Sequence, residues 1–199
     1  IGSPETVMGR DIRNIEEKGF LTFFSEIERS ALPDTFWKVT LPQNLETSSV
    51  NSPAFNTFLA AQINMNKNSL LMHGTMISDL LDISGDVHHI FPKAYLKANG
   101  VTTKSQYNQV ANYTYLDTQV NKAISDDAPA VYFKTIIDQF DSGTAEIGNI
   151  MSMEALNENI KENALPADII HMTVGDYDSF LSQRRHLMSQ MIEEYYKSL

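Results

Sequence analysis

The sequence predicts a mainly α-helical protein of the α+β class, in which two short strands are embedded among helices. Apolar residues recur at spacings of three and four along most of the chain, as they do on the buried faces of amphipathic helices. The helix-start pattern of Ser followed by Pro occurs at Ser3-Pro4 and again at Ser52-Pro53. Two runs near the middle of the chain, 87–91 and 113–116, are instead typical of strands.

Three helices are expected in the first part of the chain. The first lies between Ser3 and Gly19, because a capping serine precedes it and glycine commonly follows a helix. The second follows at 20–29, and the third begins at Ser52-Pro53, each with apolar side chains on one face. The intervening segment, 35–51, is expected to be a loop that contains at most a short strand.

The remaining helices follow the second strand. Asp117 or Thr118 caps a short helix, so the centre of the chain has the order strand, long loop, strand and helix. Longer helices are expected at 129–140, 152–163 and 177–197. The last of these is the best defined, because one stripe carries Phe180, Leu181, Leu187, Met188, Met191, Ile192 and Tyr195.

Length and composition fit one globular domain. The chain has 199 residues, of which 42% are hydrophobic and 20% are charged, and it contains no cysteine. We therefore expect a single domain, 1–199, with a helical part at 1–84, a central part at 85–125 and a second helical part at 126–199. The lack of cysteine excludes disulfides and thiolate metal sites.

The chain also lacks the patterns that direct a protein to a membrane. Its apolar runs are shorter than the ~18 residues of a membrane span, and its first residues do not form a signal peptide. We therefore expect a cytoplasmic protein with no membrane partner. Because the sequence begins at Ile1 rather than at Met, we expect a fragment of a longer protein.

Charge is distributed unevenly along the chain. The net charge of −10 argues against a protein that coats nucleic acid over its whole surface. Residues 88–122 nevertheless have a net charge of +3, with lysines at 93, 97, 104 and 122 and one acidic residue, Asp117. Four lysines often do no more than solvate a surface, so the meaning of this cluster depends on the residues that share the segment.

Two of the five histidines, His88 and His89, are adjacent in the run GDVHHIFPK. Neighbouring side chains of a strand point to opposite faces, so both can serve one site only if the strand ends there, and Pro92 indicates that it does. A lone histidine is usually a hydrogen-bonded core residue. A pair that is followed by a lysine-rich loop and an Asn-bearing strand and helix is more typical of a reactive site.

The run HHIFPKAYLKANG, followed by NQVANYTYLDTQVNKAIS, resembles the ββα-metal motif of the HNH (His-Me finger) endonucleases. The resemblance implies an embedded ββα-metal finger at 85–125, made of a two-stranded antiparallel hairpin and a short helix. It implies that His88 and Asn121 are metal ligands and that His89 is the general base. Asn112 matches the asparagine at the second strand, which belongs to the catalytic residues of the family.

The resemblance extends along most of the chain to the C-terminal part of GmrSD-type proteins, which restrict modified foreign DNA. It is carried by the runs SPETVMGRDIR, SSVNSPAFNTFLAAQ, GDVHHIFPKAYLK and DYDSFLSQRRHLMSQMIEEYYKSL. In that family an N-terminal ParB-like nucleotide-hydrolysing domain is joined to the nuclease domain. The resemblance therefore implies two partners: DNA, modified DNA included, and such an N-terminal domain in the same full-length protein.

The chemistry of phosphodiester hydrolysis fits these residues. A neutral histidine, whose ordinary pKa is near ~6.5, can take a proton from water at physiological pH, which suits His89. Mg²⁺ or Mn²⁺ held by His88 and Asn121 is the expected cofactor, and the nitrogen ligand also makes Ni²⁺ or Zn²⁺ credible. Asn112 cannot transfer a proton, so we expect it to fix the loop or to orient the base.

Several basic residues are candidates for contact with nucleic acid. Lys93 and Lys122 flank the motif and are expected to bind phosphates, which accounts for the position of the positive segment. Arg184 and Arg185 are expected to lie on a solvated face of the last helix or to form a salt bridge.

Two classes of function are consistent with the sequence. The leading hypothesis is a metal-dependent endonuclease domain that hydrolyses DNA, and the combination of a base with two metal-ligand positions favours it. The alternative is a non-catalytic interaction or regulatory module that retains the motif as a scaffold, which the net negative charge favours. RNA stays open as a substrate, because nothing in the sequence recognises a 2′-hydroxyl.

Overall fold

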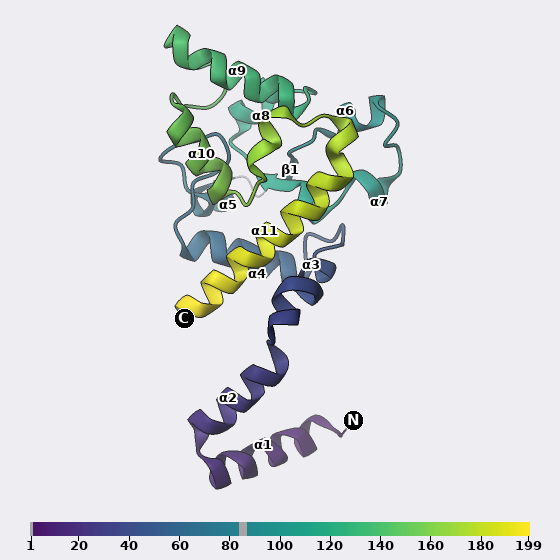
Figure 1. The fold of residues 1–199 in the computed structure, drawn as a ribbon, viewed down its shortest axis with the longest axis vertical. Helices are drawn as coiled ribbons and strands as arrows, with labels where there is room; N and C mark the ends of the chain where they lie inside the picture. The colour runs from purple at the N-terminus through teal and green to yellow at the C-terminus, as the bar shows by residue number, and fades with distance from the viewer. Residues whose placement is uncertain (1, 84–86) are drawn as a thin grey trace. The chain divides into compact units, whose positions relative to one another are not determined.

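The computed structural model describes residues 2–83 and 87–199, and the side chains of residues 82 and 83 are left out (Figure 1). It divides into two compact units, residues 1–40 and 41–199. No helix of the described residues is both long and apolar enough to span a bilayer.

The first unit contains the two predicted N-terminal helices. Helix α1 (Pro4–Lys18) begins after Ser3, whose hydroxyl accepts a hydrogen bond from the backbone N–H of Thr6. Gly19 ends α1 with a φ of 81°, and α2 (Phe20–Ala31) follows directly. A short π-helix, η1 (Phe36–Thr40), completes the unit.

The second unit is built mainly from helices, most of which the sequence predicted. Before and after the segment that holds the strands, they are α3 (Leu41–Asn44), α4 (Pro53–Asn64), α5 (Ile77–Ile83), α9 (Pro129–Ser142), α10 (Met153–Glu162) and α11 (Tyr177–Ser198). Figure 1 shows α11 passing α4, and α11 also contacts α3. The expected loop or strand at 35–51 is wrong, because η1 and α3 lie in this segment, and the side chains of Leu41 and Leu45 are buried there.

One two-stranded sheet is found among the described residues. Strand β1 (Val87–His89) pairs antiparallel with β2 (Tyr113–Tyr115), and His88 lies opposite Thr114. Both strands are shorter than predicted. The mainly α class with a small antiparallel element is confirmed.

The segment that connects the strands, residues 90–112, is more ordered than the long loop that was expected. It contains α6 (Lys93–Ala98), α7 (Lys104–Tyr107) and a 3₁₀ turn, η2 (Val110–Asn112). Helix α8 (Thr118–Ile124) follows β2, and the Asp117 carboxylate accepts hydrogen bonds from two backbone N–H groups of its first turn, as predicted.

The chain directly after β1 is anchored in the core. Phe91 is completely buried, with its ring centroid 4.8 Å from that of Phe180 and 5.2 Å from that of Tyr177, both on α11. The hydroxyl of Tyr132, on α9, donates a hydrogen bond to the carbonyl oxygen of Ile90 at 3.1 Å. Two long helices therefore fix the position at which β1 ends.

Arg184, on α11, lies inside the protein. Only 1% of its surface is exposed, and its guanidinium donates hydrogen bonds to the carbonyl oxygens of Ala111 at 2.9 Å, Tyr113 at 2.7 Å and Asn163 at 3.4 Å. Burial lowers the pKa of Arg184 to about 9, so the group is charged at neutral pH. The expected solvated face or salt bridge is therefore wrong for Arg184. Arg185 lies 3.8 Å from the Glu46 carboxylate, as a salt bridge would require.

Replacing Gly148 by alanine is expected to lower the free energy of unfolding by about 2–3 kcal/mol. Gly148 has a φ of 64°, and a Cβ atom there would lie 2.0 Å from the backbone carbonyl oxygen of Leu71. The variant therefore combines backbone strain with displacement of the Leu71 segment. Gly143 is the matched control, since its φ is 69° but no atom lies within 4 Å of an added Cβ.

Gly143→Ala should cost only the strain of the left-handed backbone, about 1 kcal/mol. Urea unfolding of both variants measures the difference. Equal losses at the two positions would show that the close approach to Leu71 has no energetic consequence.

Candidate functional site

A pocket of about 370 Å³ lies where β1, α6 and α8 meet. Four of the six site residues predicted from the sequence line it: His88, His89, Lys93 and Asn121. Its other lining residues are Val87, Pro92, Ala94, Lys97, Ser125 and Asp126. Figure 1 shows β1, α6 and α8 in the part of the ribbon above α11. Residues from separate elements are therefore brought to one cavity.

Both adjacent histidines line this pocket. The strand ends at His89, and the chain turns away at Ile90 before Pro92. Such an ending is necessary if both histidines are to serve one site, because a continuing strand would point two neighbouring side chains to opposite faces. Each histidine is half-buried, so each is shielded from bulk water on one side and accessible on the other.

The ring of His89 is held by two neighbours. Its Nε2 atom lies 3.0 Å from the Oδ1 atom of Asn108, and its ring packs edge-on against Tyr113 at a centroid distance of 5.2 Å. An amide oxygen can only accept, so Nε2 carries the proton and Nδ1 keeps a lone pair. This tautomer leaves Nδ1 as the basic atom of His89.

The environment of His89 also favours its neutral form. Burial lowers the pKa of His89, and the charges of Lys93 and His88 lower it further, whereas the hydrogen bond to Asn108 raises it. The net direction is downward from the ordinary value. His89 is therefore neutral at physiological pH, as a group that accepts a proton must be.

Asn112 lies outside the pocket and is completely buried. Its side-chain oxygen accepts a hydrogen bond from the N–H of Phe91 at 2.8 Å, and its amide group donates to the carbonyl oxygens of Phe91 at 3.1 Å and Tyr107 at 3.3 Å. Asn112 thus ties together the two ends of the segment between the strands. Of the two roles that the sequence allowed, this contact pattern belongs to fixing the loop, whereas Asn108 contacts His89.

Sequence reasoning missed Asn108. The only signal available was its place in the run NQVANYTY, four residues before Asn112, where no pattern separates one asparagine from the other. Asn108 is the C-cap residue of α7, a helix that was itself unexpected.

The α8 side of the pocket supplies oxygen donors. Asn121 lies on α8, and Ser125 ends this helix with a φ of 51°, after which Asp126 reaches the pocket. Asp126 was also missed, because its neighbour Asp127 and the following proline gave the run the composition of an ordinary turn.

The donor set around the pocket fits a divalent cation. His88 offers an imidazole nitrogen, Asn121 an amide oxygen and Asp126 a carboxylate, which is a mixed set suited to Mn²⁺, Ni²⁺ or Zn²⁺ as well as Mg²⁺. Within the described residues, no three His, Cys, Asp or Glu side chains form a cluster of metal ligands. At this pocket His88 and Asn121 would hold a metal together with oxygen ligands from water or substrate.

The two lysines predicted to bind phosphate are placed differently. Lys93 lines the pocket, whereas Lys122 is exposed on α8 and is not among the lining residues. Lys97 lines the pocket although the sequence did not single it out.

Comparison of the chain with known protein families, with curated proteins and with solved structures found no match. The assignment of the candidate site therefore rests on its residues and their geometry.

Proposed function

We propose that the chain is a metal-dependent endonuclease domain of the HNH type, which hydrolyses DNA phosphodiester bonds at the pocket formed by β1, α6 and α8. In this proposal β1, β2 and α8 are the two strands and the helix of a ββα-metal finger. The observation that carries it is the convergence of His88, His89 and Asn121 on one pocket, although Asn121 comes from a different element.

In the proposed reaction His89 is the general base. Its Nδ1 atom takes a proton from the attacking water, while Asn108 accepts from Nε2 and keeps the ring in the required tautomer. His88 and Asn121 would hold a divalent cation, which would supply positive charge against the phosphate and the leaving oxygen. Lys93 contributes positive charge at the same pocket.

The wider resemblance suggests where this activity is used. We propose that the domain acts in the cytoplasm on foreign DNA, modified DNA included. Its partner in the full-length protein is then an N-terminal ParB-like nucleotide-hydrolysing domain of the GmrSD type. In this proposal, recognition of the modification is a task for that domain.

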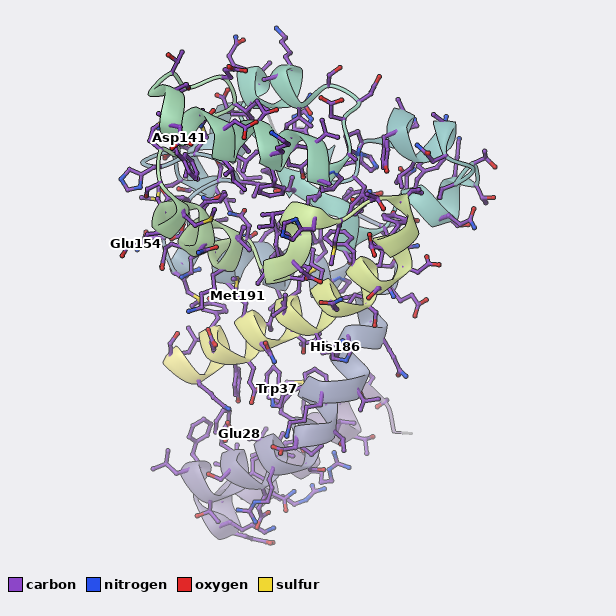
Figure 2. The ribbon with its side chains drawn as sticks, turned by 45° about the horizontal axis from the view of Figure 1, so that its top comes forward. Glu28, Trp37, Asp141, Glu154, His186 and Met191 are labelled. Atoms are coloured by element: carbon purple, nitrogen blue, oxygen red, sulfur yellow. The ribbon has the colours of Figure 1, made fainter. Side chains whose placement is uncertain are left out.

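The proposal is tested by incubating the chain with supercoiled plasmid and Mg²⁺, Mn²⁺, Ni²⁺ or Zn²⁺ in turn. We expect conversion to nicked or linear DNA with at least one of these ions and none in excess chelator. His186→Ala is the matched control, since His186 is exposed on α11 (Figure 2) and lines no part of the pocket. A single-stranded RNA of the same sequence distinguishes the alternative substrate.

The non-catalytic alternative predicts a different result. If no ion supports cleavage, and calorimetric titration shows no metal binding that depends on His88, the pocket is a scaffold and the endonuclease proposal is wrong. The net charge of −10 is the observation that favours this alternative, because most of the protein then repels nucleic acid.

Asn108→Leu is expected to reduce the rate of DNA cleavage about tenfold to a hundredfold, by analogy with other groups that orient a reactive histidine through a hydrogen bond. The variant removes the acceptor that holds the His89 tautomer. Stability should change little, because Asn108 is only half-buried. Single-turnover cleavage measures the rate, and nitrogen NMR of the imidazole reports the tautomer.

Asn99→Leu is the control for this variant. Asn99 lies in the same connecting segment, is exposed, and donates only to the carbonyl oxygen of Tyr95. Wild-type cleavage and an unchanged tautomer in Asn108→Leu would remove Asn108 from the orienting role.

A further inference from the structure

Lys93 and Lys97 lie on the same face of α6, because they are four residues apart. Both line the pocket that contains His89. Both ammonium groups also lie over the ring of Tyr107, at 5.4 Å from its centroid for Lys93 and 5.2 Å for Lys97. Two positive charges are thus held against one aromatic ring at the rim of the proposed active site.

Neither lysine forms an ion pair with another of the residues that the structure describes. Several other lysines in the described residues form ion pairs, among them Lys134 with Asp138 and Lys197 with Glu193. Among these residues Lys93 and Lys97 have no carboxylate within ion-pair distance, even though Asp126 lines the same pocket. Like charges at this helical spacing repel each other, so the arrangement gains stability when an anion binds between them.

Tyr107 holds the two lysines in place. It is 2% exposed, and its backbone carbonyl oxygen accepts hydrogen bonds from Asn112 and from the hydroxyl of Tyr177. The ring is therefore fixed by the core rather than by the lysines. A cation over an aromatic face is attracted to it, which restricts the long lysine side chains before any ligand arrives.

The two lysines are close enough together to contact neighbouring phosphates of one nucleic-acid strand. Residues four apart on a helix have Cβ atoms about 5–6 Å apart, and one strand of duplex DNA carries a phosphate every ~3.4 Å along its axis. Two flexible ammonium groups can therefore reach one phosphate and its neighbour. Lys93 is the nearer of the two to His89 along the chain, and its charge lowers the pKa of His89.

We infer that Lys93, Lys97 and the ring of Tyr107 form a phosphate cradle that receives the backbone of the DNA strand to be cut. Lys93 contacts the phosphate next to His89, and Lys97 contacts the adjacent phosphate of the same strand. This inference rests on the proposed endonuclease function and adds to it the path of the strand along α6. It assigns a phosphate-binding role to Lys97, which was not among the residues predicted to bind phosphate.

The inference is tested by fluorescence anisotropy with the full chain and a fluorescein-labelled DNA duplex, in chelator so that no cleavage occurs. Lys97→Ala should weaken binding about tenfold at low salt, the loss expected for one charged hydrogen bond. It should also reduce the slope of log affinity against log salt by about 0.9, the value for one phosphate contact. Lys97→Arg should retain both, and the effect should be the same for unrelated DNA sequences.

Lys104→Ala is the matched control. Lys104 belongs to the same positive segment and is exposed on α7, but it lines no part of the pocket and contacts no ring. An equal loss of affinity in Lys104→Ala would indicate a general effect of charge and would overturn the cradle. A Lys97→Ala variant with unchanged affinity and salt slope would overturn it as well.

Two further variants test the ring. Tyr107→Phe keeps the aromatic face and should bind DNA as the wild type does, whereas Tyr107→Leu should lose part of the affinity. Because Tyr107 is buried, the folding of Tyr107→Leu must be checked by thermal unfolding. If this variant does not fold, the lysine variants alone test the cradle. Wild-type affinity in a folded Tyr107→Leu variant would remove the ring from the cradle.

The outcomes separate the cradle from the proposed activity. DNA binding that depends on Lys97 without any metal-dependent cleavage would leave the cradle standing and reject the endonuclease. Cleavage that depends on His89, together with DNA binding that does not depend on Lys97, would support the endonuclease and reject the cradle.

Discussion

Replacing His89 by alanine is expected to lower the rate of metal-dependent DNA cleavage about a hundredfold to ten-thousandfold, the usual contribution of a general base. The variant removes the Nδ1 atom to which the proposed reaction assigns the acceptance of a proton from water. The fold should be retained, because His89 is half-buried and its ring makes few contacts besides Asn108 and Tyr113. Plasmid cleavage under single-turnover conditions, with thermal unfolding as the check on folding, measures the effect.

Combining His89→Ala with Asn121→Ala tests whether the two residues serve one step. If base and metal ligand act on the same transition state, each single variant should abolish most of the activity and the double variant should lose little more. His186→Ala again serves as the control. Rates that multiply fully in the double variant would mean that the two residues act independently, and wild-type cleavage in a folded His89→Ala variant would exclude His89 as the base.

Replacing Arg184 by methionine is expected to lower the free energy of unfolding by about 3–5 kcal/mol. Methionine fills part of the volume but leaves the carbonyl oxygens of Ala111 and Tyr113 buried without their donor. Because Tyr113 belongs to β2, the pairing of β2 with β1 should loosen as well. Urea unfolding gives the total loss, and hydrogen exchange at the β2 amides gives its local part.

Arg185→Met is the matched control for this variant. Arg185 is adjacent on α11, but its guanidinium contacts the side chains of Gln109 and of the exposed Glu46 instead of backbone carbonyl oxygens. Its replacement should cost less than about 1 kcal/mol. A loss of that size at Arg184 would show that the carbonyl contacts contribute little to stability.

The sequence predicts most elements of this fold because their signals are local. The Ser-Pro starts of α1 and α4 and the Asp117 cap of α8 are readable within four residues of each helix end. The apolar stripe of α11 is readable over its own length. These elements are where the sequence places them because neighbouring residues determine where each begins and which face it buries.

The errors occur where distant residues decide the structure. Burial of Leu41 and Leu45 gives helical turns to a segment whose own composition indicates a loop. The burial of Arg184 depends on carbonyl groups of η2, β2 and the end of α10, none of which is visible from the pattern of α11 itself. Local charge therefore suggests an exposed arginine where the fold requires a buried donor.

The candidate site shows the same division. His88, His89, Lys93 and Asn121 share a recognisable motif and line one pocket. Asn108, Lys97 and Asp126 are ordinary residues in sequence, and only the arrangement of α7, α6 and the end of α8 brings them to the site. The positions of the proposed motif can be predicted because the proposed chemistry restricts their residue types. The positions that support them accept many residue types.

The contact of Arg184 with β2 has a consequence during protein synthesis. The ribosome makes β1, β2 and α8 before α11, and folding follows the order in which segments emerge. Until α11 has emerged, the carbonyl oxygens of Ala111 and Tyr113 lack the guanidinium that pairs them, and Phe91 lacks its aromatic neighbours on that helix. A nascent chain therefore carries His88, His89 and Asn121 before the segment that bears them is held by α11. Under the proposed endonuclease function, we expect the growing polypeptide to be inactive on DNA until α11 has folded.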